Sequence, residues 1–342
     1  MSLKVWKRFL PKGLKRRIKQ IVELFRTIND IGPYSMAIAG KNKLVTKLDM
    51  LLCMILYEAS PADYYFFDFK QIPRKNRKTF LTFGKHKRLI EKNYSNKEYL
   101  AYWGKNSFLE RFSAFHKREW AMANECTLEQ FKQLSRAEGR IICKPNGGER
   151  GKGIEVLAVN DENAEQLFEK IRALNDYVLE EWIDQHPQLS RIYPDAVNPV
   201  RIQTICKENE VSIIGATLTC GKTKKYANAS SGAYFALVDI ETGEVCSDLY
   251  DYETKSVLFK HPITGVEVRG INIPFWKEAT EMVKNAAMIT PNVITIGWDV
   301  AISKNGPKLI EGNIAPGYTA YQMPVLTGVP YGNLRVFAPF LK

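Results

Sequence analysis

A glycine-rich segment between two strand-like runs constrains the fold of this 342-residue chain more than any other feature. The run at residues 140–144 leads through Pro145 into Asn-Gly-Gly-Glu-Arg-Gly-Lys-Gly, and a second run of strand type begins at Ile154. A P-loop needs a Ser or Thr after its lysine and then a helix, but Gly153 and a strand follow Lys152 here. We therefore expect a glycine-rich β-hairpin, and the P-loop NTPases are excluded.

Such a hairpin suits a polyphosphate ligand. Glycines let backbone N–H groups come close to phosphate oxygens, and nearby basic side chains supply positive charge. A solvated surface turn is the alternative, and the hairpin alone does not separate the two. The candidate phosphate-binding residues are Lys144, Gly147, Gly148, Gly151, Lys152 and Gly153.

Polar residues interrupt two apolar runs near the C-terminus. Asp299 lies within residues 297–301, and Glu311 and Asn313 lie within residues 309–313, across a turn at residues 304–307. In a hairpin of this length Asp299 can face Glu311, with Asn313 on the same face. Three oxygen donors without His or Cys favour Mg²⁺; partly exposed strand acids are the alternative.

Residues 177–183 form an apolar strand-like run that carries Glu180, Glu181 and Trp182. An edge of this kind can offer a purine backbone donors and acceptors, a carboxylate and an apolar wall. A sheet strand that simply ends in solvated acids explains the same residues.

The rest of the pattern predicts an α+β chain whose first hundred residues are mostly helical. Strands are expected at 153–158, 200–206, 211–219, 293–301 and 308–312 as well as at the segments above, and helices at 43–60, 127–137, 161–173 and 275–287.

Charge is concentrated at the N-terminus. The chain carries a formal net charge of +12, and most of the surplus lies in the first fifty residues, so nucleic acid is not the expected partner. Residues 13–28 have the pattern of a basic amphipathic helix, which suits either contact with anionic lipid or packing on a core. The longest apolar run, residues 50–57, is too short to span a bilayer. Six cysteines without CxxC spacing predict a reduced, cytoplasmic protein.

Taken together, the segments from about 100 to 320 resemble the ATP-grasp superfamily, and more narrowly its sugar-transfer-associated branch. Lys144 with the glycine loop resembles the family's lysine strand and phosphate lid, and Lys105 resembles its first lysine. Residues 180–183 resemble the adenine hinge, and Asp299, Glu311 and Asn313 resemble the magnesium triad. Residues 59–64, Ala-Ser-Pro-Ala-Asp-Tyr, resemble a short segment of the narrower branch.

The resemblance implies an ATP-grasp fold, in which two α+β subdomains clasp ATP. It places ATP-grasp subdomains at 104–190 and 191–342. The sequence pattern itself places a basic segment at 1–30 and a helical subdomain at 31–103, where the family usually has an α/β domain. The resemblance gives Lys105 and Lys144 to the α- and β-phosphates, and Arg201 to the γ-phosphate and a developing acyl phosphate. Either Asp184 or Gln188 would bind the ribose. The remaining nucleotide contacts would come from Glu180, Glu181, Trp182 and Ile183.

The resemblance also implies an ATP- and Mg²⁺-dependent ligase that joins a carboxylate to an amine through an acyl phosphate. Its substrates would be small molecules or glycans, such as a uronic acid and an amino acid, in cell-surface polysaccharide biosynthesis. A kinase acting on a sugar hydroxyl shares every nucleotide motif. A non-catalytic basic protein that binds nucleic acid or membrane is the third and most distant alternative.

Overall fold

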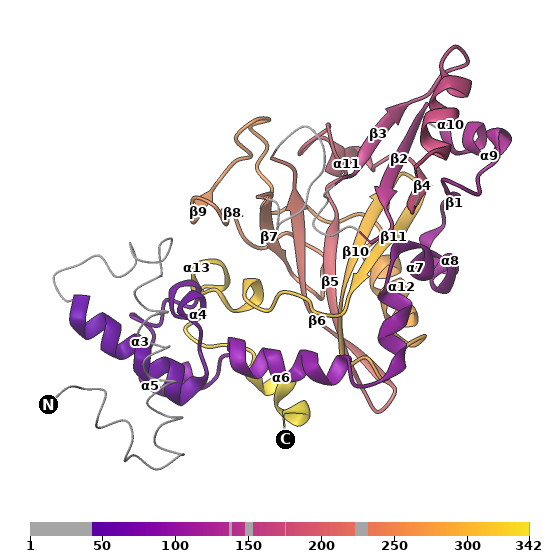
Figure 1. The fold of residues 1–342 in the computed structure, drawn as a ribbon. Helices are drawn as coiled ribbons and strands as arrows, with labels where there is room; N and C mark the ends of the chain where they lie inside the picture. The colour runs from indigo at the N-terminus through magenta and orange to yellow at the C-terminus, as the bar shows by residue number, and fades with distance from the viewer. Residues whose placement is uncertain (1–42, 137–138, 148–152, 175, 223–231, 342) are drawn as a thin grey trace, which may run out of the picture. The chain divides into compact units, whose positions relative to one another are not determined.

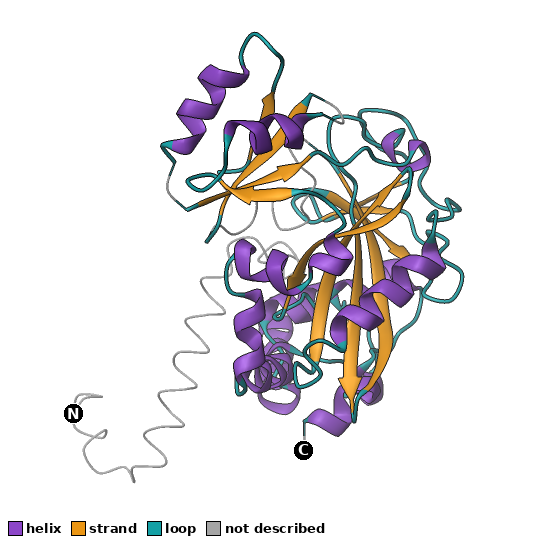
Figure 2. Cartoon of the chain, turned by 90° about the vertical axis from the view of Figure 1, so that its right-hand side faces the viewer, coloured by secondary structure: helices purple, strands orange, loops and turns teal. Residues whose placement is uncertain are grey.

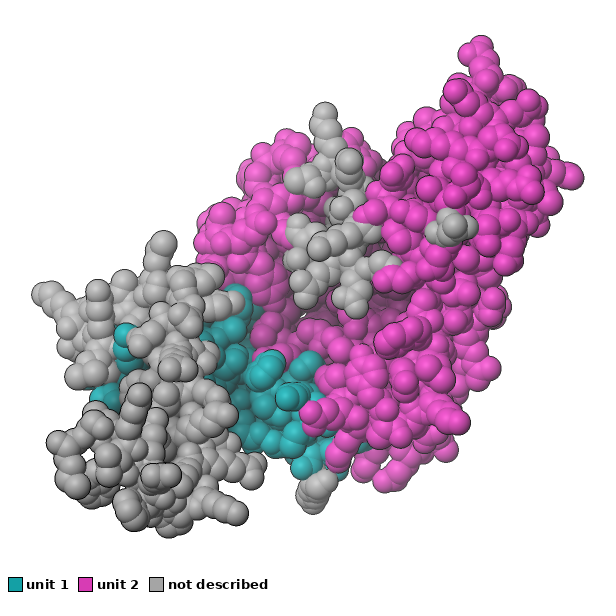
Figure 3. Space-filling view, viewed as in Figure 1, with its two compact units in different colours: residues 1–88, 322–342 teal, residues 89–321 magenta. Residues whose placement is uncertain are grey.

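The computed structural model describes residues 43–136, 139–147, 153–174, 176–222 and 232–341. The chain divides into two compact units, one of residues 1–88 and 322–342 and the other of residues 89–321 (Figure 3). Each unit is described by itself below. The predicted basic segment at 1–30 lies outside the described residues. Over the described residues, no helix combines the length and apolar character that crossing a membrane requires.

The first unit is helical, as the sequence predicted. Ser60 caps its second helix, and a reciprocal pair of hydrogen bonds with Asp63 starts this helix directly after the helix predicted at 43–60. Its core contains Phe67, Phe69 and Phe80, which are fully buried. The helices are α3 (Lys43–Tyr57), α4 (Pro61–Phe66), α5 (Arg74–Arg77), the first part of α6 (Phe83–Asn93), α13 (Pro324–Thr327), α14 (Leu334–Phe337) and η5 (Ala338–Phe340).

The second unit begins with short helices and contains two antiparallel sheets (Figures 1 and 2). The smaller sheet has the strand order β1-β4-β2-β3, and α9 packs on β2 and β4 with α10 beside it. The helices and strands of this part of the unit are η2 (Lys97–Tyr102), α7 (Lys105–Arg111), α8 (Ser113–His116), β1 (Trp120–Met122), α9 (Leu128–Ser135), β2 (Arg140–Pro145), β3 (Glu155–Ala158), α10 (Ala164–Arg172) and β4 (Tyr177–Glu181).

The larger sheet has seven strands in the order β11-β10-β5-β6-β7-β8-β9. Helix α12 packs against β5, β6, β10 and β11. The elements are α11 (Pro187–Ser190), β5 (Val200–Lys207), β6 (Glu210–Cys220), β7 (Tyr234–Val238), β8 (Leu249–Asp251), β9 (Ser256–Leu258), α12 (Trp276–Ala287), β10 (Thr295–Ser303), β11 (Gly306–Asn313) and η4 (Ala320–Gln322).

The two faces of the larger sheet differ in character. One face carries Ile202, Leu218, Val300 and Leu309 into the main hydrophobic core, where α12 lies. Because side chains alternate along a strand, the intervening residues Arg201, Thr217, Asp299 and Glu311 share the opposite face. The functional candidates of the larger sheet therefore lie on the face away from the α12 core.

Candidate active site

The glycine-rich hairpin has the predicted strands on both sides. Strands β2 and β3 pair antiparallel, with Cys143 opposite Glu155. Gly153 has φ +75°, and a Cβ there would lie 2.7 Å from the Pro145 ring, so this position favours glycine. Gly147 is exposed. Gly148, Gly151 and Lys152 lie outside the described residues.

Lys105 lies at the end of β2, beside the hairpin. It is the first residue of α7, after Gly104 with φ +87°, and its Nζ donates to the Pro145 carbonyl at 2.7 Å. Burial lowers the pKa of Lys105, and the nearby Glu311 carboxylate acts in the opposite direction. The turn after β2 thus brings this lysine beside the end of the strand that carries Lys144.

Lys144 is held by a buried carboxylate. Its Nζ lies 2.8 Å from Glu180 Oε1, and Glu180 Oε2 lies 2.6 Å from the Arg118 guanidinium. Desolvation acts to raise the pKa of Glu180, but Lys144 and Arg118 lower it well below its usual range. The Glu180 side chain therefore faces the interior and contacts Lys144, although the sequence pattern placed it at the adenine hinge.

The segment after β4 connects the two sheets. Gln185 forms a bridge with Ser303, and the His186 N–H donates to the Ile302 carbonyl at 2.8 Å. The backbone of Glu181 is already paired, because its N–H donates to Glu119 and its carbonyl accepts from Arg118. Within the described part of the chain, the backbones of Trp182 and Ile183 make no hydrogen bonds to other backbone groups. Their backbone groups could pair with the edge of a purine.

The remaining hinge candidates differ in their contacts. Asp184 is half-buried and lies 2.6 Å from Lys304 Nζ. Gln188 donates through Nε2 to the Asn272 carbonyl at 3.0 Å. Trp182 lies under the Arg140 guanidinium, 5.2 Å from its ring centre, and the Ile183 side chain is buried. Asp184 and Gln188 therefore both remain candidates for the ribose.

Asp299 and Arg201 face each other on adjacent strands of the larger sheet. They are direct partners in the register of β10 with β5, and the guanidinium donates two hydrogen bonds of 2.6 Å to the carboxylate. Asp299 raises the pKa of Arg201 further above its ordinary value. This two-point geometry orients the arginine as well as pairing its charge.

A β-bulge brings Glu311 to the same face as Asp299. The register pairs Val300 with Leu309 and Asp299 with Glu311, so Ile310 is the extra residue. Without this bulge, Glu311 would pair with Trp298 and point into the core. Asn313 pairs with Gly297 and shares the face of Glu311. The predicted facing of Asp299 and Glu311 is confirmed, and the bulge is the physical reason for it.

The two carboxylates fit a divalent cation. Although Glu311 is exposed, desolvation of its carboxyl group, the Asp299 charge and a hydrogen bond to Asp299 raise the pKa of Glu311 to about 7. The position between the facing carboxyl groups of Asp299 and Glu311, where a bound proton reduces their repulsion, also suits a metal ion. Among the described residues no group of three His, Cys, Asp or Glu could hold a metal, so the third ligand here would be Asn313.

Several residues of the site have no sequence motif. Lys308 lies on the site face of β11, and burial lowers its pKa while Glu181 acts against this. Thr217 on β6 is the register partner of Arg201 on β5. The Tyr321 ring lies over Gly215 and hydrogen bonds to Thr217. A glycine within a strand rich in β-branched residues was the one sequence signal for this close approach.

Lys105 of α7 and Lys144 of the smaller sheet interact electrostatically with Glu311 of the larger sheet. Glu311 affects Lys105 electrostatically, and Lys144 acts on Glu311. Cations at one side and a carboxylate pair with an arginine at the other can bind a triphosphate and neutralise charge that develops on it.

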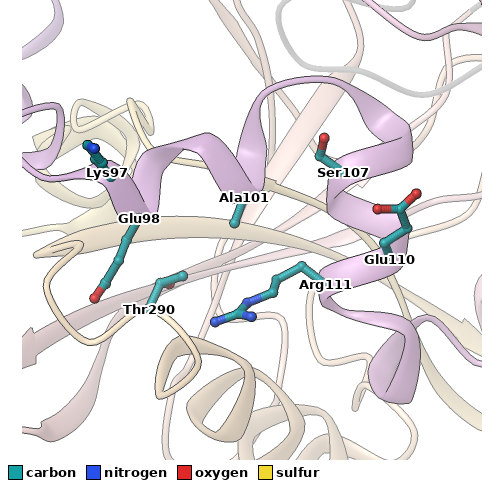
Figure 4. Close-up of a pocket in the computed structure, with 7 residues that line it drawn as sticks. All are labelled: Lys97, Glu98, Ala101, Ser107, Glu110, Arg111 and Thr290. Carbon is teal, nitrogen blue, oxygen red and sulfur yellow. The ribbon is translucent and has the colours of Figure 1, made fainter.

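A separate pocket of about 500 Å³ lies on the outer side of α7. Glu98 and Arg111 extend toward Thr290 there (Figure 4). Its α7 residues lie on the helix side opposite Lys105. It contains none of the predicted site residues.

Two antiparallel sheets, each with helices packed on it, carry these residues, and this arrangement is an ATP-grasp fold. A family model described as sugar-transfer associated ATP-grasp matches residues 121–330, which is more than half of the chain. The chain therefore belongs to this family, and both the predicted resemblance and the predicted fold class are confirmed. No curated protein matches the sequence.

Solved structures of ligases match at low identity. D-alanyl-alanine synthetase A from Vibrio cholerae is 12% identical with a TM-score of 0.43, covering 72% of this chain and 65% of that one. N5-carboxyaminoimidazole synthetase from Staphylococcus aureus is 12% identical with a TM-score of 0.39, covering 68% and 53%. The ATP-grasp ligase PsnB with a precursor peptide is 13% identical with a TM-score of 0.42, covering 72% and 60%. The chain spans about half the length of the first solved structures it matches.

Proposed function

We propose that this protein is an ATP- and Mg²⁺-dependent ligase that forms an amide through an acyl phosphate. The observation that carries the proposal is the electrostatic interaction of Lys105 and Lys144 with Glu311, the β11 carboxylate that faces Asp299 on β10. This charge pattern suits a nucleotide triphosphate.

In the proposed reaction, a substrate carboxylate oxygen attacks the γ-phosphorus and ADP leaves. An amine then attacks the acyl carbon, phosphate leaves, and the amine loses a proton. Lys105 and Lys144 would hold the α- and β-phosphates, with Gly147, Gly148, Gly151, Lys152 and Gly153 as the lid. Mg²⁺ held by Asp299, Glu311 and Asn313 would neutralise phosphate charge when bound. Arg201, oriented by Asp299, would stabilise the acyl phosphate.

Trp182 and Ile183 would read the adenine edge, and Asp184 or Gln188 would contact the ribose. We also propose that the nucleotide-binding region divides near residue 190 into two ATP-grasp subdomains. The hinge segment that joins the two sheets at Gln185 and Ser303 supports it.

The family description associates the matched region with sugar transfer. We therefore propose a role in making or modifying cell-surface polysaccharide, such as capsule or O-antigen, with a uronic acid and an amino acid as model substrates. The basic N-terminal pattern favours a cytoplasmic protein that contacts the inner face of an anionic membrane through residues 1–28.

Hydroxylamine trapping tests the chemistry. A ligase given ATP, Mg²⁺, its carboxylate and hydroxylamine yields a hydroxamate together with ADP. A kinase acting on a sugar hydroxyl, the second candidate, yields ADP and a phosphorylated sugar without hydroxamate. A panel of uronic acids and amino acids that releases no ADP with either readout would contradict both.

A further inference from the structure

Arg118 is a buried arginine directly behind the candidate phosphate lysine. Its side chain is fully buried, and one nitrogen lies 2.6 Å from Glu180 Oε2. A second nitrogen donates to the Glu181 carbonyl at 3.1 Å. The guanidinium therefore contacts both the carboxylate that holds Lys144 and the backbone at the start of the hinge.

A strained turn places Arg118 in this position. Helix α8 ends at His116, and Lys117 follows with φ +53° and ψ +34°, a left-handed conformation that costs energy in a residue other than glycine. The turn directs both His116 and Arg118 inward, where each is buried.

His116 links this cluster to the larger sheet without adding charge. Burial and the neighbouring Arg118 lower the pKa of His116 to about 3, so the ring is neutral at physiological pH. Its Nδ1 lies 3.0 Å from the Leu309 carbonyl. Because a carbonyl only accepts, we assign the ring proton to Nδ1. Leu309 precedes the bulge that sets the position of Glu311.

The charges in the cluster explain what Arg118 does for Lys144. Arg118 and Lys144 share one carboxylate, Glu180, through its two separate oxygens. Two buried cations against one buried anion leave an excess positive charge. If Arg118 were absent, Glu180 would neutralise Lys144 completely, and little charge would be left for a phosphate.

We propose that Arg118 is a positioning residue that engages Glu180 and so keeps the charge of Lys144 available to the nucleotide phosphates. The inference rests on the proposed function, because it assumes that ATP binds at Lys144. The same guanidinium fixes the Glu181 carbonyl, which leaves the next two residues to face the purine.

Calorimetric titration of the full chain with ATP and Mg²⁺ tests the charge balance. Arg118→Met should weaken ATP binding roughly 10- to 100-fold, the usual result of removing one partner from a buried charge network. Arg118→Met combined with Glu180→Gln should recover most of the affinity. In this variant no carboxylate at position 180 neutralises Lys144, so no arginine is needed to engage it. Arg118→Lys should bind nearly as well as wild type. Arg172→Met, at an exposed arginine over the Phe168 ring, is the matched control and should not change affinity.

Thermal unfolding of the same variants separates this role from a structural one, because neutralising the buried Glu180 can also repair stability. The charge role requires Arg118→Met to lose ATP affinity at a temperature where it is still folded, and the double variant to regain that affinity. Wild-type affinity in Arg118→Met, or a double variant as weak as Arg118→Met, would overturn the inference while leaving the proposed function intact. Wild-type protein that fails to bind ATP would overturn both. If Arg118→Met alone does not fold, ATP binding by both Arg118→Lys and the double variant supports the inference, and loss in the double variant overturns it.

Discussion

Replacing Arg201 by methionine should destabilise the protein more than any other single change at the carboxylate pair. Methionine keeps much of the side-chain volume but leaves Asp299 without the guanidinium that donates two hydrogen bonds of 2.6 Å. Glu311 adds a second carboxylate on the same face. The variant therefore places two acidic groups together with no cation from β5.

The size of the effect follows from burial. The Arg201 and Asp299 side chains are 26% and 12% exposed, between a surface pair worth up to about 1 kcal/mol and a buried pair whose disruption costs about 3–5 kcal/mol. We expect a loss of about 2–3 kcal/mol in the free energy of unfolding at neutral pH without metal. For a unit of this size the loss corresponds to a fall in Tm of roughly 5–10 °C.

Thermal unfolding followed by circular dichroism measures this loss. Arg191→Met, at an exposed arginine of the same unit, is the control and should change Tm little. Arg201→Met with Asp299→Asn should recover much of the loss, and added Mg²⁺ should raise the Tm of Arg201→Met more than that of wild type. An Arg201→Met protein as stable as the control would refute the assignment of Arg201 as the charge partner of Asp299.

The remaining predictions concern packing and acid stability. Gly215→Ala places a Cβ 2.5 Å from a ring carbon of Tyr321 and should cost about 1–3 kcal/mol in thermal unfolding; Gly317→Ala, with open space around it, should not, and equal Tm values would contradict the packing of Tyr321. The folded protein lowers the pKa of His116 from its ordinary value of 6.5 to about 3, so the unfolded chain binds this proton first and stability falls as pH drops below about 6.5. His116→Gln should therefore flatten the fall in Tm between pH 7 and pH 5, and an unchanged profile would show that this ring does not titrate on unfolding.

Local sequence signals predicted the elements with strong periodicity or punctuation. The glycine-rich hairpin and the α12 helix follow from patterns within about fifteen residues, and the structure places β2, β3 and α12 there. The facing of Asp299 and Glu311 also agrees with the register. In these cases turn chemistry and alternation of side chains decide the structure locally.

Other parts of the site depend on contacts that no local pattern contains. The bulge at Ile310 inverts the parity of β11, and nothing in its sequence distinguishes Ile310 from an ordinary strand residue. Arg118 and His116 acquire their role from Glu180, some sixty residues away, and from a left-handed turn at a lysine. The short strands β1, β8 and β9 have three residues each, too few for a periodic signal.

The most direct test of the central claim is an equilibrium titration of ATP with and without Mg²⁺. The account predicts one nucleotide per chain in the wild-type protein and tighter binding with Mg²⁺. Lys144→Ala should lose affinity at both conditions, and Glu311→Ala should keep weak binding that Mg²⁺ no longer strengthens. Wild-type affinity in both variants, or no nucleotide binding by the wild-type protein, would contradict a nucleotide site formed by the hairpin lysine and the β10–β11 carboxylates.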